Sequence, residues 1–269
     1  MSTALPPVAP PLRPDRGWSR HFAPSEALQW LDAGWRDFHT QPALSLSYGI
    51  LVFAVSGVIV AGLIGFGWDY ILFPAFAGFM VVGPILAVGL YEKSRRLVAG
   101  QAVSLGDMIV VHPASGMQIL FTGVLLCLLM LLWMRAAVII YALFFGLLPF
   151  PGLDNIAAML FTTPVGAAML IVGGAVGAVF AAFSFAISAF SIPMMLEKRL
   201  DALTAMGTSM VLVWHNLPVM VAWGALVLAL FLASLGTGLL GLIVAFPVLG
   251  HGTWHAYRAI ERERAATAG

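Results

Sequence analysis

SGMQILFTGVLLCLLMLLWMR, residues Ser115 to Arg135, contains no charged residue before its last position. A helix that crosses about 30 Å of hydrocarbon needs about 20 largely uncharged residues. Five other segments satisfy this condition, so the predicted spans are about 44–66, 71–91, 115–135, 169–192, 216–235 and 238–256. Unpaired backbone groups are costly in lipid, and these runs lack the alternation of β-barrel strands. The sequence therefore predicts an all-α integral membrane protein with six transmembrane helices.

The composition agrees with this prediction. Of the 269 residues, 61% are hydrophobic and 9% are charged, whereas a soluble domain is about 25% charged and about 45–50% apolar. A soluble fold has no means of burying so much apolar surface. The single cysteine, Cys127, lies among leucines and excludes a disulfide framework within one chain. We interpret it as a packing residue.

The positions of the basic residues predict the orientation. Twelve of the 13 Lys and Arg residues fall before the first predicted span or after the second, fourth and sixth: Arg13, Arg16, Arg20, Arg36, Lys93, Arg95, Arg96, Lys198, Arg199, Arg258, Arg262 and Arg264. All of these segments lie on one side of a six-span protein, and positive loops remain in the cytoplasm. We therefore expect both termini in the cytoplasm. The predicted organisation is a disordered N-terminal tail (1–23), a transmembrane domain (24–258) and a C-terminal tail (259–269).

A threefold internal repeat is a second prediction. Each odd-numbered span follows a short segment with a histidine and a proline: 34–42, 106–113 and 210–218. Each even-numbered span ends with a proline and a polar exit: 83–96, 192–201 and 246–258. The pattern predicts three pseudo-repeated hairpins, each preceded by a cytoplasmic interfacial amphipathic helix. In the first such helix, Leu28, Leu31 and Trp35 share one face.

The second unit differs from the others by the segment 136–168 between its two spans. This segment is too apolar for a solvated loop, and prolines 149, 151 and 164 interrupt it. We expect an outer elaboration that lies in the interface.

Arg135, at the start of this elaboration, allows two interpretations. A charged group at membrane depth favours an outer-face polar site with Asp154 or Asp69 as its partner. Counting from Ser115 at 1.5 Å per residue instead places Arg135 about 30 Å along its span, where arginines extend to the headgroups. We prefer the lipid anchor.

Small residues in the fourth span predict a helix-packing face. Gly173, Gly177 and Ala181 are spaced by four residues, which allows another helix to approach the backbone closely. We expect this span in the middle of the bundle.

Few residues are candidates for catalysis or for binding a metal or cofactor. His251 and His255 are four apart and could share a metal, but His39, His112 and His215 recur near prolines, which favours capping or interfacial hydrogen bonds. The pairs Glu92–Lys93 and Glu197–Lys198 resemble solvated helix ends near anionic lipid. No phosphate-binding loop, nucleophile elbow or nucleic-acid stripe is present in the sequence. We therefore predict no catalytic residue, no metal site and no cofactor, with haem or quinone binding left open.

Three motifs carry a resemblance to a known family. They are GWRDF followed by SLSYG (34–49), LYEKSRRL (90–97) and NLPVMVAWG (216–224). Over most of its length the chain resembles an uncharacterised bacterial family of six-span integral membrane proteins, some of which are labelled as a cytochrome c oxidase subunit. The resemblance implies a bacterial cytoplasmic (inner) membrane and an association with respiration. A catalytic haem-copper subunit would have twelve spans and several histidines inside the membrane, so only an accessory or assembly subunit fits.

Two functional hypotheses follow. The first is a non-enzymatic accessory or assembly subunit of a respiratory terminal oxidase complex, with the lipid bilayer and other membrane subunits as partners and no nucleic acid. The alternative is a small-solute or lipid transporter or channel built on a pseudo-threefold bundle. A polar cavity that reaches the midplane would favour the transporter.

Overall fold

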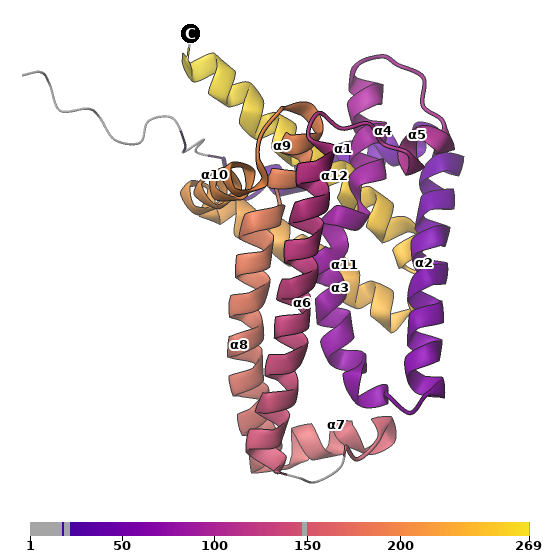
Figure 1. The fold of residues 1–269 in the computed structure, drawn as a ribbon, viewed down its shortest axis with the longest axis vertical. Coiled ribbons are helices and arrows are strands. Elements are labelled where there is room, and N and C mark those ends of the chain that lie inside the picture. Colours follow the sequence, from indigo (N-terminus) through magenta and orange to yellow (C-terminus); the bar gives the residue numbers. More distant parts are fainter. Residues whose placement is uncertain (1–17, 19–21, 147–149, 269) are drawn as a thin grey trace, which may run out of the picture.

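The computed structural model describes residues 18, 22–146 and 150–268, and every regular element in this part of the chain is helical (Figure 1). In chain order the elements are α1 (Glu26–His39), α2 (Pro42–Gly65), the 3-10 turn η1 (Asp69–Ile71), α3 (Leu72–Leu86), α4 (Val88–Val98), α5 (Leu105–Ile109), α6 (Gly116–Phe145), α7 (Leu153–Thr162), α8 (Pro164–Ser188), α9 (Ser191–Glu197), α10 (Ala202–His215), α11 (Leu217–Gly236) and α12 (Leu242–Ala268).

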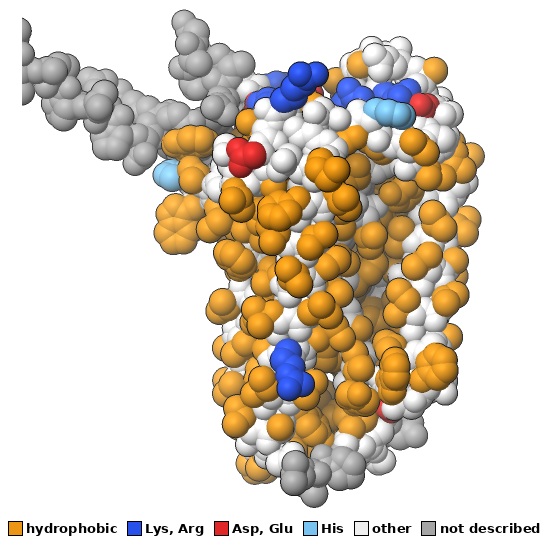
Figure 2. All heavy atoms as spheres, viewed as in Figure 1, with side chains coloured by type: hydrophobic (Ala, Val, Ile, Leu, Met, Phe, Trp, Pro, Cys, Tyr) orange, Lys and Arg blue, Asp and Glu red, His pale blue; other side chains and the backbone are white. Residues whose placement is uncertain are grey.

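Five helical segments are long and apolar enough to cross a membrane: Pro42–Gly65, Asp69–Val98, Gly116–Phe145, Pro164–Glu197 and Leu217–Gly236. Their apolar side chains cover most of the surface in Figure 2, whereas most charged side chains gather at the end of the molecule where α4 and α5 lie. A soluble protein would bury such side chains, so this apolar surface is suited to contact with lipid. The chain is an all-helical integral membrane protein.

The sixth predicted span, 238–256, differs from what is observed. From Leu242 on, its residues belong to α12, which is not among the five candidate segments. A Cβ atom added to Gly49 of α2 would lie 2.1 Å from the carbonyl oxygen of Ile243, so the two helices meet there. From Gly49, α2 continues to Gly65, about 24 Å further at 1.5 Å per residue, but α12 begins at Leu242.

The α11–α12 hairpin therefore turns beside the upper part of α2. In Figure 1 the two helices run obliquely, and their turn lies above the lower ends of α2, α6 and α8. The physical reason lies in the sequence of α12, whose apolar run ends where His251 and His255 begin a polar segment. The apolar part is too short to cross the hydrocarbon.

The third span is longer than predicted. The helix α6 does not end at Arg135 but continues to Phe145, because 136–145 contains neither glycine nor proline. It ends at Gly146, whose φ of 63° lies in the left-handed region. The predicted elaboration 136–168 is thus divided among the end of α6, the separate helix α7 and the start of α8 at Pro164.

The predicted repeat of an amphipathic helix and a hairpin stays a prediction. The helices α1, α5 and α10 precede α2, α6 and α11, but α5 has only 5 residues. The pseudo-threefold arrangement remains a prediction.

The two predicted tails also contain ordered elements. Most of the tail 1–23 lies outside the described residues, but Asn216 donates to the carbonyl of Trp18 over 3.0 Å, and the ring of Phe22 packs against Trp30. At the other end, α12 continues through the predicted tail 259–269 as far as Ala268.

The close contact between α2 and α12 generates a stability prediction. The Gly49→Ala variant places its Cβ against the backbone of Ile243, and such overpacking costs about 1–3 kcal/mol of unfolding free energy. Gly57→Ala, on the same helix, has no atom within 4 Å, and we expect it to be neutral or to stabilise by up to about 1 kcal/mol. Denaturant unfolding in detergent micelles, followed by circular dichroism, compares the two; equal stabilities would contradict the contact.

Candidate functional site

Six polar side chains from four helices meet near the charged end of the molecule. They are Asp37 of α1, Ser45 of α2, Lys93 and Ser94 of α4, and His251 and His255 of α12, and we call them the polar network. Ser45, Lys93, Ser94 and His251 are fully buried. Charged groups inside a membrane protein are rare and mark functional or structural centres.

The ammonium group of Lys93 is completely satisfied. It donates to the carbonyl oxygens of Asp37 and Gln41 over 3.0 and 3.2 Å and to the Ser45 hydroxyl oxygen over 2.8 Å. These three bonds use all three protons of an ammonium group. The Asp37 carbonyl lies in the last turn of α1, where helix carbonyls lack partners and a cation is favoured, and Gln41 directly precedes α2. Lys93 therefore caps α1 from a different helix.

The hydrogen-bond directions then determine the state of His251. Ser45 accepts from Lys93, so its own proton points to Nε2 of His251, 2.9 Å away. Ser94 donates to Oδ2 of Asp37 over 2.6 Å, so it accepts from Nδ1 of His251 over 2.8 Å. This arrangement requires a neutral imidazole with its proton on Nδ1. A continuous chain of hydrogen bonds thus runs from the Lys93 cation to the Asp37 carboxylate.

The carboxyl group of Asp37 ends this chain. Burial by itself would raise the pKa of Asp37, but hydrogen bonds from Nε2 of His255 and from Ser94 outweigh burial, and the pKa is lowered. Asp37 is therefore ionised at neutral pH and balances the charge of Lys93. Because none of the six residues lines either cavity described below, the polar network fastens α1, α2, α4 and α12 together and does not contact a substrate there.

The predicted solvated pair Glu92–Lys93 is instead buried. Glu92 is 1% exposed and accepts two 2.7 Å bonds from Arg95 and a third, also of 2.7 Å, from Arg96. The pair Glu197–Lys198 is half-buried: Glu197 accepts from Tyr257 and Arg258 over 2.9 and 2.6 Å, and Lys198 pairs with Glu261. The interpretation as solvated helix ends was wrong because α12 packs against α4 and α9 and removes these ends from water.

A large apolar cavity of about 990 Å³ lies between α3, α8, α10, α11 and α12, and we call it the central cavity. One wall consists of small residues of α8, including Gly174, Ala178 and Ala182, and α11 forms the opposite wall with residues such as Gly224 and Leu228. None of the described residues that line it is Asp, Glu, Lys or Arg. The hydroxyl groups of Tyr91 and Ser184, two buried residues of this lining, have no hydrogen-bond partner among the described residues.

The predicted helix-packing face of α8 is turned partly toward α6. A Cβ atom on Gly177 would lie 3.0 Å from the ring of Trp133, and one on Gly173 would lie 3.9 Å from Ile140. Ala181, the third residue, lines the central cavity.

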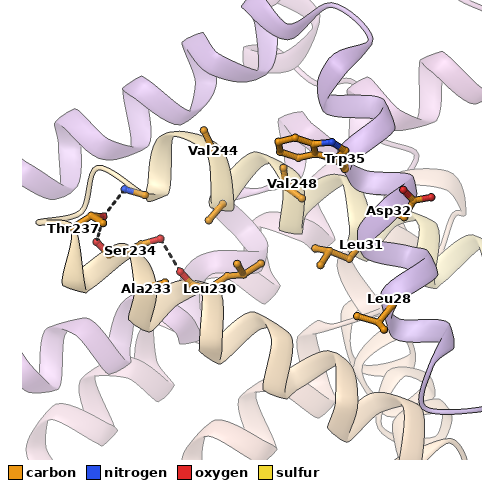
Figure 3. A pocket seen from close by; sticks show the side chains of 12 residues that line it. Leu28, Leu31, Asp32, Trp35, Leu230, Ala233, Ser234, Thr237, Val244 and Val248 are labelled. Atoms are coloured by element: carbon orange, nitrogen blue, oxygen red, sulfur yellow. Dashed lines mark hydrogen bonds between the residues drawn. The ribbon is translucent and has the colours of Figure 1, made fainter.

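A smaller apolar pocket of about 510 Å³ lies on the other side of the α11–α12 hairpin. Figure 3 shows Leu28, Leu31 and Trp35 of α1 opposite Leu230 and Val248 of the hairpin. These three α1 residues form the apolar face that the sequence predicts, and Leu28 and Trp35 remain exposed. The opposite face of α1 is buried, with Ala27, Trp30, Gly34 and Phe38 inside the protein. The helix α1 is thus apolar on two sides.

The predicted outer-face site is not assembled by the described side chains. Arg135 is exposed on α6 and forms no hydrogen bond or ion pair with Asp69 or any other described side chain. The side chain of Asp154 lies outside the described part of the structure. The site of Arg135, Asp154 and Asp69 therefore stays a prediction.

Of the three histidines predicted to form capping or interfacial hydrogen bonds, His39 and His215 form such bonds, and for His112 this stays a prediction. His39 and His215 bond to the carbonyls of Trp35 and Val211, four residues earlier, over 2.9 and 2.8 Å. His251 and His255 face Ser45, Ser94 and Asp37 and not each other. No group of three metal-ligating side chains occurs within the described residues.

Sequence reasoning missed the polar network, although its signals were present. Asp37, Ser45, Lys93 and Ser94 all belong to the motifs that carry the family resemblance, and His251 and His255 were noted only as a metal pair. Polar residues that flank apolar spans are equally typical of solvated ends. Only their convergence in space distinguishes a buried network.

The fold and the polar network define a helical integral membrane protein, and the comparisons agree with that class. A family model described as "Predicted integral membrane protein (DUF2189)" matches residues 72–197, which extend from α3 through α9. Over this segment, slightly less than half of the chain, the protein is similar to an uncharacterised membrane domain. No curated protein and no solved structure matches the chain.

The polar network predicts that two aspartates of α1 contribute unequally to the unfolding free energy. Asp37→Asn removes the anion that balances Lys93, and breaking a buried charge pair costs about 3 kcal/mol or more of unfolding free energy. Asp32→Asn removes a carboxylate from an exposed pair with Arg36 and costs less than about 1 kcal/mol. Equal losses in detergent-solubilised protein would contradict the network.

The same residue predicts a pH dependence. The pKa of Asp37 in the folded protein lies below the ordinary pKa of an aspartate. The stabilisation that its carboxylate contributes is therefore present above that ordinary pKa and is lost as the pH falls through the lower, folded-state pKa. Between pH 5 and 8 the Asp37 carboxyl stays ionised, so it should cause no change in the stability difference between wild type and Asp37→Asn. Below about pH 4 this difference should shrink. Unfolding curves at stepwise pH measure it, and a difference that grew at acid pH would have the wrong sign.

Proposed function

We propose that the protein is a non-enzymatic membrane protein that binds a neutral lipid-like molecule from the bilayer in the central cavity. The observation that carries the proposal is the apolar, uncharged lining of this cavity. Its volume of about 990 Å³ falls in the range of cavities that hold small molecules, which are usually apolar with a few polar groups.

The charge of the lining selects the class of ligand. The described lining offers no Asp, Glu, Lys or Arg as a counter-ion, and His215 is its one imidazole, so moving an ionised head group into this site is unfavourable. The ligand is therefore uncharged, as a long-chain alcohol, a glyceride or a quinone with an isoprenoid chain is.

Two hydroxyl groups offer a place for the polar head of this ligand. Tyr91 and Ser184 lack partners among the described residues, and a buried hydroxyl without a partner is unfavourable. A carbonyl or hydroxyl head that bonds to them would satisfy ligand and protein together. The apolar chain would then lie along the small residues of α8.

The orientation and the cellular setting are parts of the same proposal. The charged end that contains the polar network faces the cytoplasm by the positive-inside rule. The bacterial inner membrane and the accessory role in a terminal oxidase rest on the sequence and the family resemblance alone. Of the transporter alternatives, a lipid carrier suits an apolar cavity, whereas a polar solute does not.

Lipid extraction followed by mass spectrometry tests the proposal. Protein purified in mild detergent should retain one class of neutral lipid at near-stoichiometric amount. Gly174→Phe should lose it at least tenfold, because no atom lies within 4 Å of the Cβ position of Gly174 and the ring would fill the cavity. Val58→Phe, on the exposed face of α2, is the control and should retain it.

A second variant tests the proposed hydrogen bond to the polar head of the ligand. Tyr91→Phe removes one hydroxyl and leaves the shape of the cavity unchanged. Loss of one hydrogen bond to a neutral head costs about 1 kcal/mol, a decrease in affinity of about fivefold. Titration of the delipidated protein with the lipid identified by mass spectrometry measures this change. Unselective retention of bulk phospholipid by wild type and Gly174→Phe alike would refute the proposal.

A further inference from the structure

Arg135 is the one basic residue of the described chain that lies well inside a candidate span away from the polar network and its neighbours. Its side chain is exposed, and it has no hydrogen-bond or ion-pair partner among the described side chains. The residues one turn away on both sides, Leu131, Leu132, Val138 and Ile139, are exposed and apolar. Arg135 is therefore a cation in the centre of an apolar outer face.

The length of α6 brings this cation within the hydrocarbon. Arg135 is followed by ten helical residues, about 15 Å of helix, which end at Phe145 and expose apolar side chains such as Ile139 and Leu143. The complete helix of 30 residues is about 45 Å long and exceeds the hydrocarbon thickness, so it tilts. Immersing its last ten residues in lipid also immerses Arg135.

This depth argues against the headgroup anchor. To place Arg135 among the phosphates of its nearer headgroup layer, the apolar residues beyond it would have to enter water. A carboxylate on an adjacent helix at the same depth requires no such exposure. Pairing with an acidic residue is also how intramembrane arginines are usually stabilised.

We propose that the face of α6 around Arg135 binds a transmembrane helix of another protein that carries an aspartate or glutamate at matching depth. A second copy of this chain is the other source of a carboxylate, and the crosslinking test below distinguishes it. Among its described residues, the acidic groups in candidate spans are Asp69, Glu92 and Glu197, all near span ends. The inference is independent of the central cavity, which lies between other helix faces.

Site-specific photo-crosslinking in native membranes tests it. A photoreactive residue at Ile139 should give a crosslink to one membrane protein, and one at Val58 of α2, also exposed, should give none. Arg135→Gln should reduce the Ile139 crosslink at least tenfold, whereas Arg135→Lys should keep it within about threefold. Gel filtration of the purified variants establishes that both are folded.

The identity of the captured helix decides the outcome. Mass spectrometry should locate the crosslink in a transmembrane segment with an acidic residue, its neutral amide variant should also abolish the crosslink, and Arg135→Glu should regain it when that residue is changed to arginine. The proposal is overturned by crosslinks to lipid only, by a crosslink unaffected by Arg135→Gln, or by a tagged second copy as the captured chain. It is also overturned if Asp154→Asn reproduces the effect of Arg135→Gln, since the partner would then be internal.

Discussion

The buried ammonium group of Lys93 is the interaction on which the arrangement of helices depends. A cation without water is stable only when its protons have acceptors, and Lys93 finds them at the end of α1 and on α2. Through Ser45 it is joined to His251, and so to α12. Since α12 is connected to α11 by a short turn, the position of the α11 wall of the central cavity follows from this one group.

Apolar contact alone does not determine such an arrangement, because lipid chains are as apolar as the helices. Here the hydrogen bonds of the polar network fix which helices are neighbours, and glycines allow their backbones to approach closely. Gly34 of α1 and Gly49 of α2 both meet backbone atoms of α12 at distances that leave no room for a side chain. Where the polar network and these glycines end, as in the lower half of α2, the helices separate.

Much of the fold could be predicted from the sequence, because long apolar runs have few alternatives in lipid. The helical class and the first, second, fourth and fifth spans follow from that constraint. The end of the third span did not, because Arg135 has the same helix-forming tendency as its neighbours and marks no boundary. The sixth span is not among the candidate segments, because the apolar run of α12 ends before His251 and is too short to cross the hydrocarbon.

The candidate site was less predictable for a related reason. Sequence order separates Asp37 from His255 by more than 200 residues, and no local pattern indicates that they meet. The central cavity is still harder to foresee, since its walls have the composition of ordinary lipid-facing helices. Such a space is a property of how helices are spaced and not of which residues they contain.

The hairpin of α11 and α12 also makes the cross-section of the molecule unequal along its length. Near the charged end the hairpin adds its two helices to the bundle, whereas below the turn α2, α3, α6 and α8 continue, with the short helix α7 at their lower end (Figure 1). In a bilayer the protein therefore occupies a larger cross-sectional area in the leaflet near the charged end than in the other leaflet.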